Sequence, residues 1–366
     1  MAMDSPNSVG SIFGWRIAQH SQTRVSVVCR SNYETVKRSG FSFRTKVWGQ
    51  GHFIPHHVYR ASSLCTQPPK QKFDYVVCAN KVNVESYASI IDELRTVVDD
   101  NTTIVCAQNG MDVELPLSHA FPHNTVLSAI CNVGCMQPQH GQIHQTAGLN
   151  PKAFLIGTYA YGPDANNVKQ KLLAACDTAF GSVGDVRMQR WRKLLFNCVW
   201  NATSALTDLD THQALAHPDA LHLASSIAAE AYQVAIRDGA QLGVEYPRAV
   251  IDLAASSAPI VPSTLQDARN RRPMEIDSIW GFLITKAAQY QVQVPTIQMV
   301  YDVLLHRNTT FRQPHHGDIK HYLAQIFSTA SLPDTPSMAS TDIWLDDQSV
   351  GKEELRRYTL NATAVG

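Results

Sequence analysis

Three polar side chains recur every four residues in a segment that is otherwise largely apolar. Lys193, Asn197 and Asn201 lie in WRKLLFNCVWN. At about 3.6 residues per turn, this spacing keeps them on one face of a helix. Unpaired buried amide and ammonium groups are costly, so the pattern predicts a polar stripe that faces a cleft. A stripe that faces solvent is the alternative that the pattern leaves open.

A second segment has features of a nucleotide site. Gly10 lies at the start of a predicted helix, and Arg30 directly follows the apolar run VSVVC. In dinucleotide-binding α/β domains, the amides of the first helix bind pyrophosphate, and the residue that ends the second strand contacts the adenosine ribose. An arginine there favours a 2′-phosphate, hence NADP over NAD. An arginine at a strand end is usually a solvated surface residue, and this segment alone does not show that Arg30 contacts a cofactor.

A third segment, PSTLQDARNRRPMEIDSIWGF, joins a polar turn to a predicted helix over Met274–Tyr290 that carries Glu275. Carboxylates early in a helix complement its dipole, so Glu275 could simply serve the helix. Helix propensity does not distinguish this role from a chemical one.

The elements that must position these residues change in kind along the chain. The first half contains short apolar runs bounded by polar residues, as expected of strands buried on both faces. Amphipathic segments, which predict crossover helices, lie before the first of these runs at Gly10–Gln19 and between two of them at Val84–Asp99. The predicted strands are Val25–Cys29, Asp74–Cys78, Thr103–Cys106, Val126–Ile130 and Phe154–Ile156. This alternation predicts a parallel α/β sheet.

From about Arg187 onward, long amphipathic patterns replace the strand-like runs. The predicted helices are Trp191–Leu206, Ala220–Leu242, Pro247–Ser257 and Met274–Tyr290. We therefore predict a Rossmann-like domain over residues 1–186, an all-helical domain over 187–330 and a polar tail with a short docked helix over 331–366.

Composition excludes several classes of partner. Lys+Arg and Asp+Glu both number 31, so the formal net charge is zero and supplies no basic field for nucleic acid or an anionic membrane. No run reaches the roughly 18 apolar residues that cross a bilayer, and we expect a cytoplasmic protein. The eight cysteines are scattered, several within apolar runs, and lack zinc-site spacing, so buried thiols and no metal are expected.

Three segments together resemble the ketopantoate reductases (2-dehydropantoate 2-reductases) and their fungal relatives. They are VVCRSNYETVKRSGF, AQNGMDVE, and KLLFNCVWNATSALT combined with PSTLQDARNRRPMEIDSIWGF. The resemblance extends from near Gly10 to near Arg307. It implies an N-terminal Rossmann domain and a C-terminal helical domain, with NADPH and a 2-keto acid meeting between them.

By this resemblance, Lys193 is the general acid that protonates the alkoxide formed when hydride reaches the carbonyl carbon. Glu275 binds a substrate hydroxyl and holds the surroundings of Lys193. Four further residues orient the substrate: Asn109, Asn197, Asn201 and Ser263. The cofactor contacts implied are Gly10, Arg30, Lys81 and Asn109.

The start of the chain departs from this family. Ser5-Pro-Asn-Ser-Val-Gly10 occupies the register of the glycine turn GxGxxG, and only the third glycine, Gly10, is present. Pro6 removes a backbone donor, and the side chains of Ser5 and Asn7 replace two glycines. The strand before this turn is expected to be essentially absent. Either the true start lies upstream, or the protein has abandoned dinucleotide binding.

Three functions follow. The first is an NADPH-dependent reductase of a 2-keto acid or related carbonyl compound, in fungal secondary metabolism, acting on a small molecule as a homodimer. The second is a non-redox acid–base catalyst on the same scaffold, such as a cyclase, an aldol-type catalyst or an isomerase. The third is a pseudoenzyme that serves as a binding subunit, which the intact polar stripe disfavours.

Overall fold

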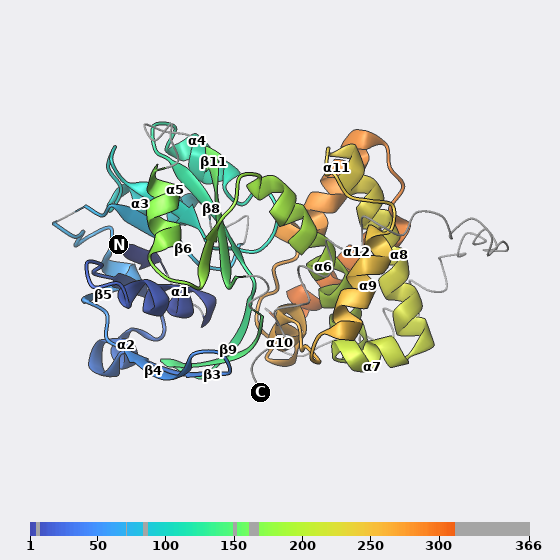
Figure 1. The fold of residues 1–366 in the computed structure, drawn as a ribbon, viewed down its shortest axis with the longest axis horizontal. Coiled ribbons are helices and arrows are strands. Elements are labelled where there is room, and N and C mark those ends of the chain that lie inside the picture. Colours follow the sequence, from blue (N-terminus) through green and yellow to red (C-terminus); the bar gives the residue numbers. More distant parts are fainter. Residues whose placement is uncertain (5–7, 71, 83–86, 149–151, 161–167, 312–366) are drawn as a thin grey trace. The chain divides into compact units, whose positions relative to one another are not determined.

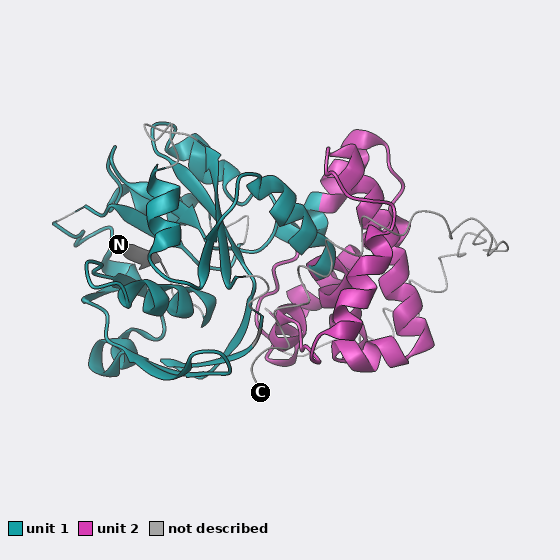
Figure 2. Cartoon of the chain, in the orientation of Figure 1, with its two compact units in different colours: residues 1–196, 277–282 teal, residues 197–276, 283–366 magenta. Residues whose placement is uncertain are grey.

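The computed structural model describes residues 1–4, 8–70, 72–82, 87–148, 152–160 and 168–311 (Figure 1). The chain forms two compact units. Unit 1 holds residues 1–196 and 277–282, and unit 2 holds residues 197–276 and 283–366 (Figure 2). The polar tail predicted over 331–366 lies outside the described residues.

Unit 1 is built on an eight-stranded sheet with the order β12-β11-β8-β7-β6-β1-β2-β5. The strands are β1 (Ala2–Asp4), β2 (Ser26–Cys29), β5 (His57–Arg60), β6 (Tyr75–Cys78), β7 (Thr103–Cys106), β8 (Val126–Cys131), β11 (Phe154–Ala160) and β12 (Phe180–Ser182). The six strands from β5 to β8 are parallel. Counted along the chain, their order is third, second, first, fourth, fifth, sixth, which is the order of a dinucleotide-binding sheet, with the topological switch between β1 and β6.

The first strand, which the sequence led us to expect to be essentially absent, is present. Met3 of β1 pairs with Val27 on one side and with Val77 on the other. Ladder hydrogen bonds use backbone groups, so three residues without an apolar run suffice to fill the centre of the sheet. Residues 5–7, which correspond to the first part of the glycine turn, lie outside the described residues.

The sequence predicts a parallel sheet, but this sheet contains one antiparallel pair of strands. β11 runs antiparallel to β8, and the chain between them forms the hairpin of β9 (Val133–Gln139) and β10 (Gln142–Gly148). An antiparallel neighbour needs no crossover helix. The hairpin joins β3 (Phe41–Thr45) and β4 (Gly49–Phe53) in a second sheet of order β4-β3-β10-β9, which the sequence analysis did not predict.

Helices cover the large sheet on both faces (Figure 1). They are α1 (Ser8–Ala18), α2 (Tyr33–Ser39), α3 (Tyr87–Arg95), α4 (Leu115–Ala120) and α5 (Val168–Ala175), with a 3-10 turn, η1 (Ala61–Ser63). Val77 shares one core with Phe13 of α1. The adjacent Val76 shares the other core with Leu94 of α3 and Leu117 of α4. Consecutive residues of a strand therefore face opposite cores, which explains the uninterrupted apolar runs. On its other side, α1 contacts the small sheet through Trp15, which stacks on Phe43 at 4.4 Å between ring centroids.

The long helix α6 (Val186–Thr207) runs from unit 1 into unit 2. The described part of unit 2 contains helices and connecting segments, with no strand. The remaining helices are α7 (Thr211–Ala216), α8 (Pro218–Arg237), α9 (Tyr246–Ser256), α10 (Ser263–Arg269), α11 (Phe282–Tyr290) and α12 (Pro295–Thr310). Glu230 of α8 accepts the backbone N–H groups of Thr296 and Ile297 at 2.9 and 2.8 Å, and so satisfies the first turn of α12.

The helix predicted over Met274–Tyr290 begins later than expected. A π-helical turn, η3 (Asp277–Gly281), precedes α11, and the residues from 273 to 276 have no regular secondary structure. Glu275 therefore lies in the segment before the helix and is not in its first turn. The backbone N–H of Met274 is held by the Asn308 side chain at 3.0 Å, which ties this segment to α12. Propensity places a carboxylate near a helix start but does not fix the starting residue.

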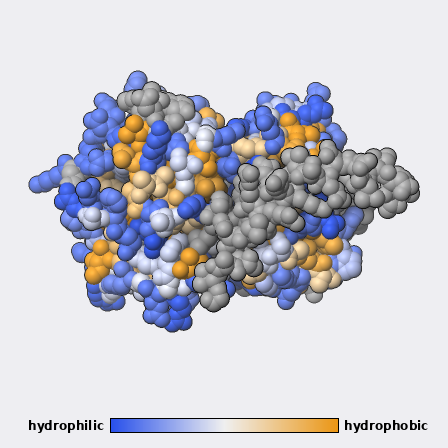
Figure 3. Space-filling view, viewed as in Figure 1, coloured by the Kyte–Doolittle hydropathy of each residue, from blue (hydrophilic) through white to orange (hydrophobic). Residues whose placement is uncertain are grey.

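On the face seen in Figure 3, hydrophilic residues surround separate hydrophobic patches. In the described part of the chain, Ile54 and Val244 are the most exposed of the large apolar side chains, at 71% each. Among the described residues, no helix is both long and apolar enough to span a bilayer.

Candidate active site

The candidate residues of unit 1 lie after the carboxyl ends of neighbouring parallel strands. Arg30 follows β2, Lys81 lies three residues beyond β6, and Asn109 lies three residues beyond β7. The last residues of these strands are in register, with Cys78 beside Cys106. All three side chains therefore originate at the same edge of the sheet, where open α/β folds bind their ligands.

Lys193 is brought to this edge by α6. Its ammonium group donates hydrogen bonds to the Asn109 side-chain oxygen Oδ1 at 2.8 Å and to the backbone oxygen of Cys131, the last residue of β8, at 2.5 Å. Both acceptors are neutral carbonyl oxygens, so these contacts orient the ammonium group without cancelling its charge. Lys193 is half-buried, and a positive charge in such a place can act on a substrate more strongly than in water.

The electrostatic influence of Lys193 extends to the following hairpin. Its charge lowers the pKa of the Cys135 thiol in β9, but burial has a larger effect and raises that pKa well above its ordinary value. Cys135 therefore stays a neutral thiol beside Lys193 at physiological pH. The five most buried thiols behave as apolar core residues, as the sequence indicated: Cys29, Cys78, Cys106, Cys131 and Cys198.

The loop that carries Asn109 has an unusual backbone. Gly110 adopts φ +99°, and a Cβ atom there would lie 2.4 Å from the backbone oxygen of Ser278 in η3. The N–H of Met111 donates to that same oxygen at 3.2 Å. Asp112, two residues beyond Gly110, also has a positive φ of 52°. Position 110 therefore requires a glycine, because of both its positive φ and the close approach of the Ser278 backbone.

A residue that the sequence analysis missed holds this loop from the other side. The buried Arg190 of α6 donates to the backbone oxygens of Gln108 and Gly110, both at 2.9 Å. It also forms an ion pair with Glu114, at 2.5 Å from Nε to Oε1. The segment RWRK contains three basic residues, Arg190, Arg192 and Lys193. Their spacing alone does not show which of them is buried.

The ends of β6 and β7 are joined by a buried amide contact. The Gln108 side chain donates to both oxygens of Asn80, at 3.1 Å to the backbone and 2.9 Å to the side chain. Asn80 in turn donates to the backbone oxygen of Lys81 at 3.1 Å. The Lys81 side chain itself is exposed.

The carboxyl ends of β2 and β5 are cationic. Arg30 is exposed, and Arg60 at the end of β5 forms an ion pair with Glu34. The Arg60 guanidinium also lies 4.2 Å from the ring centroid of Tyr33. Gly10 is buried in the first turn of α1, which begins at Ser8, four residues beyond the end of β1.

The remaining candidate residues belong to unit 2. Asn197 and Asn201 lie on α6, which is continuous through Lys193, so the four-residue spacing does place them on one stripe of this helix. Asn201 is buried at 5% exposure, whereas Asn197 is half-buried. Ser263 is the exposed first residue of α10, and the Glu275 carboxylate is buried at 8% exposure.

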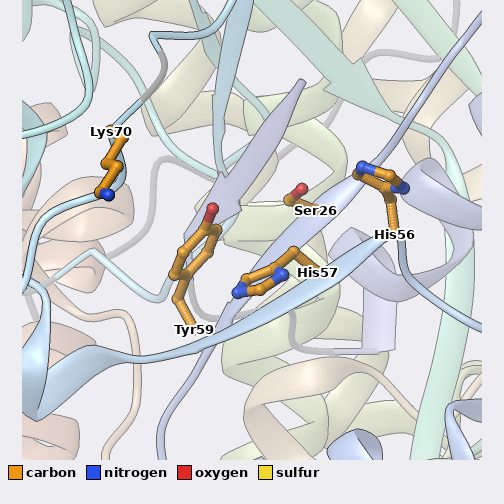
Figure 4. Close-up of a pocket in the computed structure, with 5 residues that line it drawn as sticks. All are labelled: Ser26, His56, His57, Tyr59 and Lys70. Atoms are coloured by element: carbon orange, nitrogen blue, oxygen red, sulfur yellow. The ribbon is translucent and has the colours of Figure 1, made fainter.

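A separate pocket of about 230 Å³ lies on unit 1 (Figure 4). Its lining residues are Ser26, His56, His57, Tyr59 and Lys70. Ser26 and His57 pair across the first positions of β2 and β5, so the pocket lies at the amino ends of these strands. It is therefore remote from the carboxyl edge and forms no part of the candidate site. Within the described segments, no group of three or more metal-ligating residues is found.

The fold and the site define a class: a two-unit protein with a dinucleotide-type sheet, an ammonium group at its carboxyl edge, and a helical second unit. Residues 6–160 match the family model described as ketopantoate reductase PanE/ApbA. Residues 185–308 match the model of the ketopantoate reductase PanE/ApbA C terminal. The chain belongs to the ketopantoate reductase family, as the sequence indicated.

Individual relatives are similar over most of the chain. The uncharacterized protein YDL144C of Saccharomyces cerevisiae is 25% identical over 324 residues, which cover 81% of this chain and 90% of the relative. The 2-dehydropantoate 2-reductase of Nostoc sp. is 22% identical over 303 residues, covering 81% and 91%. The crystal structure of 2-dehydropantoate 2-reductase from Methylococcus capsulatus superposes with a TM-score of 0.73 at 26% identity, covering 87% of this chain and 99% of that one.

Proposed function

We propose that this protein is an NADPH-dependent reductase of a 2-keto acid or a related carbonyl compound. The observation that carries the proposal is the Lys193 ammonium group, held by Asn109 and by the Cys131 backbone at the carboxyl edge of a sheet with dinucleotide-binding strand order. A charged proton donor at this edge is what carbonyl reduction requires.

The residues of unit 1 fit a dinucleotide. The strand order changes direction between β1 and β6, and the N-terminus of α1 follows β1, where amides can bind pyrophosphate. Gly10 lies in that first turn, and Arg30 is exposed at the end of β2, where the ribose is expected. Lys81 and Asn109, after β6 and β7, complete the cofactor side. NADPH, when bound, supplies the hydride.

The charges at the ends of β2 and β5 favour NADPH over NADH. Arg30 can pair with a 2′-phosphate, whereas a ribose hydroxyl calls for a carboxylate. Glu34, the nearby carboxylate, is already paired with Arg60. The net charge left for a ligand at this place is therefore positive.

Lys193 gives its proton to the substrate oxygen as negative charge develops there. Asn109 and the Cys131 carbonyl keep the ammonium group aimed at one position, so that little reorganisation is needed when the oxygen becomes charged. In unit 2, we assign Asn197, Asn201 and Ser263 to substrate orientation and Glu275 to a substrate hydroxyl. These four assignments are supported by the match of residues 185–308 to the family's C-terminal model.

We further propose a homodimer in the cytoplasm with a role in fungal secondary metabolism. The similarity to a Saccharomyces cerevisiae protein supports a fungal lineage. Light scattering of the purified chain tests the oligomeric state.

A non-redox acid–base catalyst is the second candidate, and one sequence observation favours it. Ser5, Pro6 and Asn7 occupy the register in which two glycines let a backbone approach pyrophosphate. In this alternative, Lys193 and Glu275 would catalyse a cyclisation, an aldol-type closure or an isomerisation without a nicotinamide.

One pair of measurements distinguishes the two. The full chain is titrated with NADPH by cofactor fluorescence, and NADPH consumption is then followed with a panel of 2-keto acids that includes 2-dehydropantoate. We expect saturable binding and turnover of at least one keto acid. Absence of binding at millimolar NADPH would refute the reductase. The matched control is Lys193→Ala, which should bind NADPH as the wild type does but lose turnover.

A further inference from the structure

The loop between β7 and α4 is held by one buried cation. The Arg190 guanidinium is 5% exposed and reaches four different partners at 2.9 Å or less. Its Nη1 donates to the backbone oxygens of Gln108 and Gly110, and its Nε donates to Glu114 and to the Ser128 hydroxyl, the latter at 2.7 Å. These contacts connect α6 to both ends of the loop and to β8.

The two backbone oxygens bound by Arg190 belong to the residues on either side of Asn109. Holding one peptide group before Asn109 and one after Gly110 restricts the backbone of the loop from which the Asn109 side chain projects. The Asn109 side chain is the one that accepts the Lys193 hydrogen bond. Arg190 and Lys193 are three residues apart on α6 and so lie on one face of the helix. From this face, Arg190 binds the loop backbone and Lys193 donates to the Asn109 side chain.

The chemistry of this position calls for an arginine. Glu114 has no exposed surface, and a buried carboxylate requires a cationic partner. A guanidinium presents five N–H groups in a rigid fork, whereas a lysine has one nitrogen that cannot reach both carbonyls and the carboxylate together. An ion pair required only for stability would not need to reach the two carbonyls beside Asn109.

We propose that Arg190, with Glu114 as its counter-ion, is a positioning residue that holds Asn109 in the orientation needed by Lys193. This inference rests on the proposed function, since it gives Lys193 the proton-donating role. Arg190 acts through the loop and is not a group that touches the substrate.

Two conservative substitutions test the proposal. Arg190→Lys keeps the charge but loses the fork, and Glu114→Gln keeps the shape but loses the counter-ion. We expect kcat to fall about 10- to 100-fold, because small displacements of reacting groups cost about that much. The Kd for NADPH should change less than kcat does, because Asn109 is one of four proposed cofactor contacts but one of the two acceptors that hold Lys193.

The chain offers a matched control. Arg187 lies one turn earlier on α6 and pairs with Asp112 of the same loop at 2.8 Å, but its side chain is 42% exposed. Arg187→Lys should leave kcat within about twofold, as expected for an exposed ion pair. Equal losses in Arg187→Lys and Arg190→Lys would overturn the proposal, as would a wild-type kcat in a folded Arg190→Lys protein.

A readout without turnover separates this inference from the proposed function. The side-chain amide resonance of Asn109, assigned with an Asn109→Asp variant, is sensitive to the hydrogen bond that the Asn109 side-chain oxygen accepts from Lys193. We expect it to shift in Arg190→Lys and in Glu114→Gln, and to remain in place in Arg187→Lys. An inactive wild type would refute the reductase, while an unmoved Asn109 resonance in both test variants would refute the positioning role. Should Arg190→Lys fail to fold, Glu114→Gln decides the outcome by the same resonance and by kcat.

Discussion

Lys193 and Asn109 are 84 residues apart in the sequence, and in the structure the ammonium group of one donates to the side-chain oxygen of the other at 2.8 Å. The lysine comes from α6 and the asparagine from the loop after β7. Both belong to unit 1, together with Cys131, the second acceptor. The proposed proton donor is thus anchored within the unit that carries the dinucleotide-type sheet.

Replacing Lys193 by alanine should lower kcat by about 10²–10⁴-fold, the usual contribution of a positioned acid or base. The fold should persist, because the change removes a half-buried polar group and no core methyl cluster. Lys193→Arg should not rescue turnover, since a guanidinium is bulkier and effectively never gives up its proton. Steady-state kinetics and circular dichroism melts of both variants check this. Full activity in the alanine variant would contradict the assignment.

Much of the sheet could be predicted because its strands are buried on both faces. The run TIVC gives β7 with the predicted bounds, and YVVC gives β6 within one residue of them. The helix that carries Lys193 follows from its apolar periodicity. The roles of the candidate residues came from a family resemblance, since spacing left a solvent-facing stripe open for Lys193 and propensity left a helix-dipole role open for Glu275.

The parts of the fold and site that could not be predicted depend on partners that are distant in sequence. β3 alternates buried and exposed residues, but it is stabilised by β10, about 100 residues later, and by Trp15 of α1. β1 is defined by its neighbours and not by apolar content. Arg190 is recognisable as a buried cation only when Glu114 and the loop carbonyls are placed beside it.

Cofactor selectivity should depend on Arg30 and Arg60 in different ways. Arg30→Ala should weaken NADPH and leave NADH nearly unchanged, because only the 2′-phosphate needs the guanidinium. Arg60→Ala should instead strengthen the binding of NADH, because it releases the Glu34 carboxylate for a ribose hydroxyl. The double variant Arg60→Ala with Glu34→Gln is the control and should lose that gain. Fluorescence titration with both cofactors measures each Kd, and equal losses for both cofactors in Arg30→Ala would contradict the site.

The folded protein should lose stability as the pH rises above about 9. Burial raises the pKa of Cys29 from 9.0 to about 12, and it raises the pKa values of Cys106 and Cys198 as well. Between these limits the unfolded chain has lost thiol protons that the folded chain retains, so unfolding becomes more favourable with rising pH. Each thiol contributes up to about 1.4 kcal/mol per pH unit. Urea unfolding at pH 8, 9 and 10 measures the slope, which Cys29→Ala should make shallower. A constant free energy of unfolding would be inconsistent with these buried thiols.

The last prediction concerns the loop that presents Asn109. Gly110→Ala should destabilise the protein and lower turnover, because φ +99° is strained for alanine and the new methyl group would lie 2.4 Å from the Ser278 backbone oxygen. A strained backbone alone costs about 1–3 kcal/mol. Gly49→Ala is the matched control, since Gly49 also has a positive φ, +70°, but nothing lies within 4 Å of its Cβ position. We expect a larger drop in melting temperature for Gly110→Ala and a loss of kcat in that variant alone. If the two variants melted and turned over alike, the close approach of the loop to η3 would have no bearing on the site.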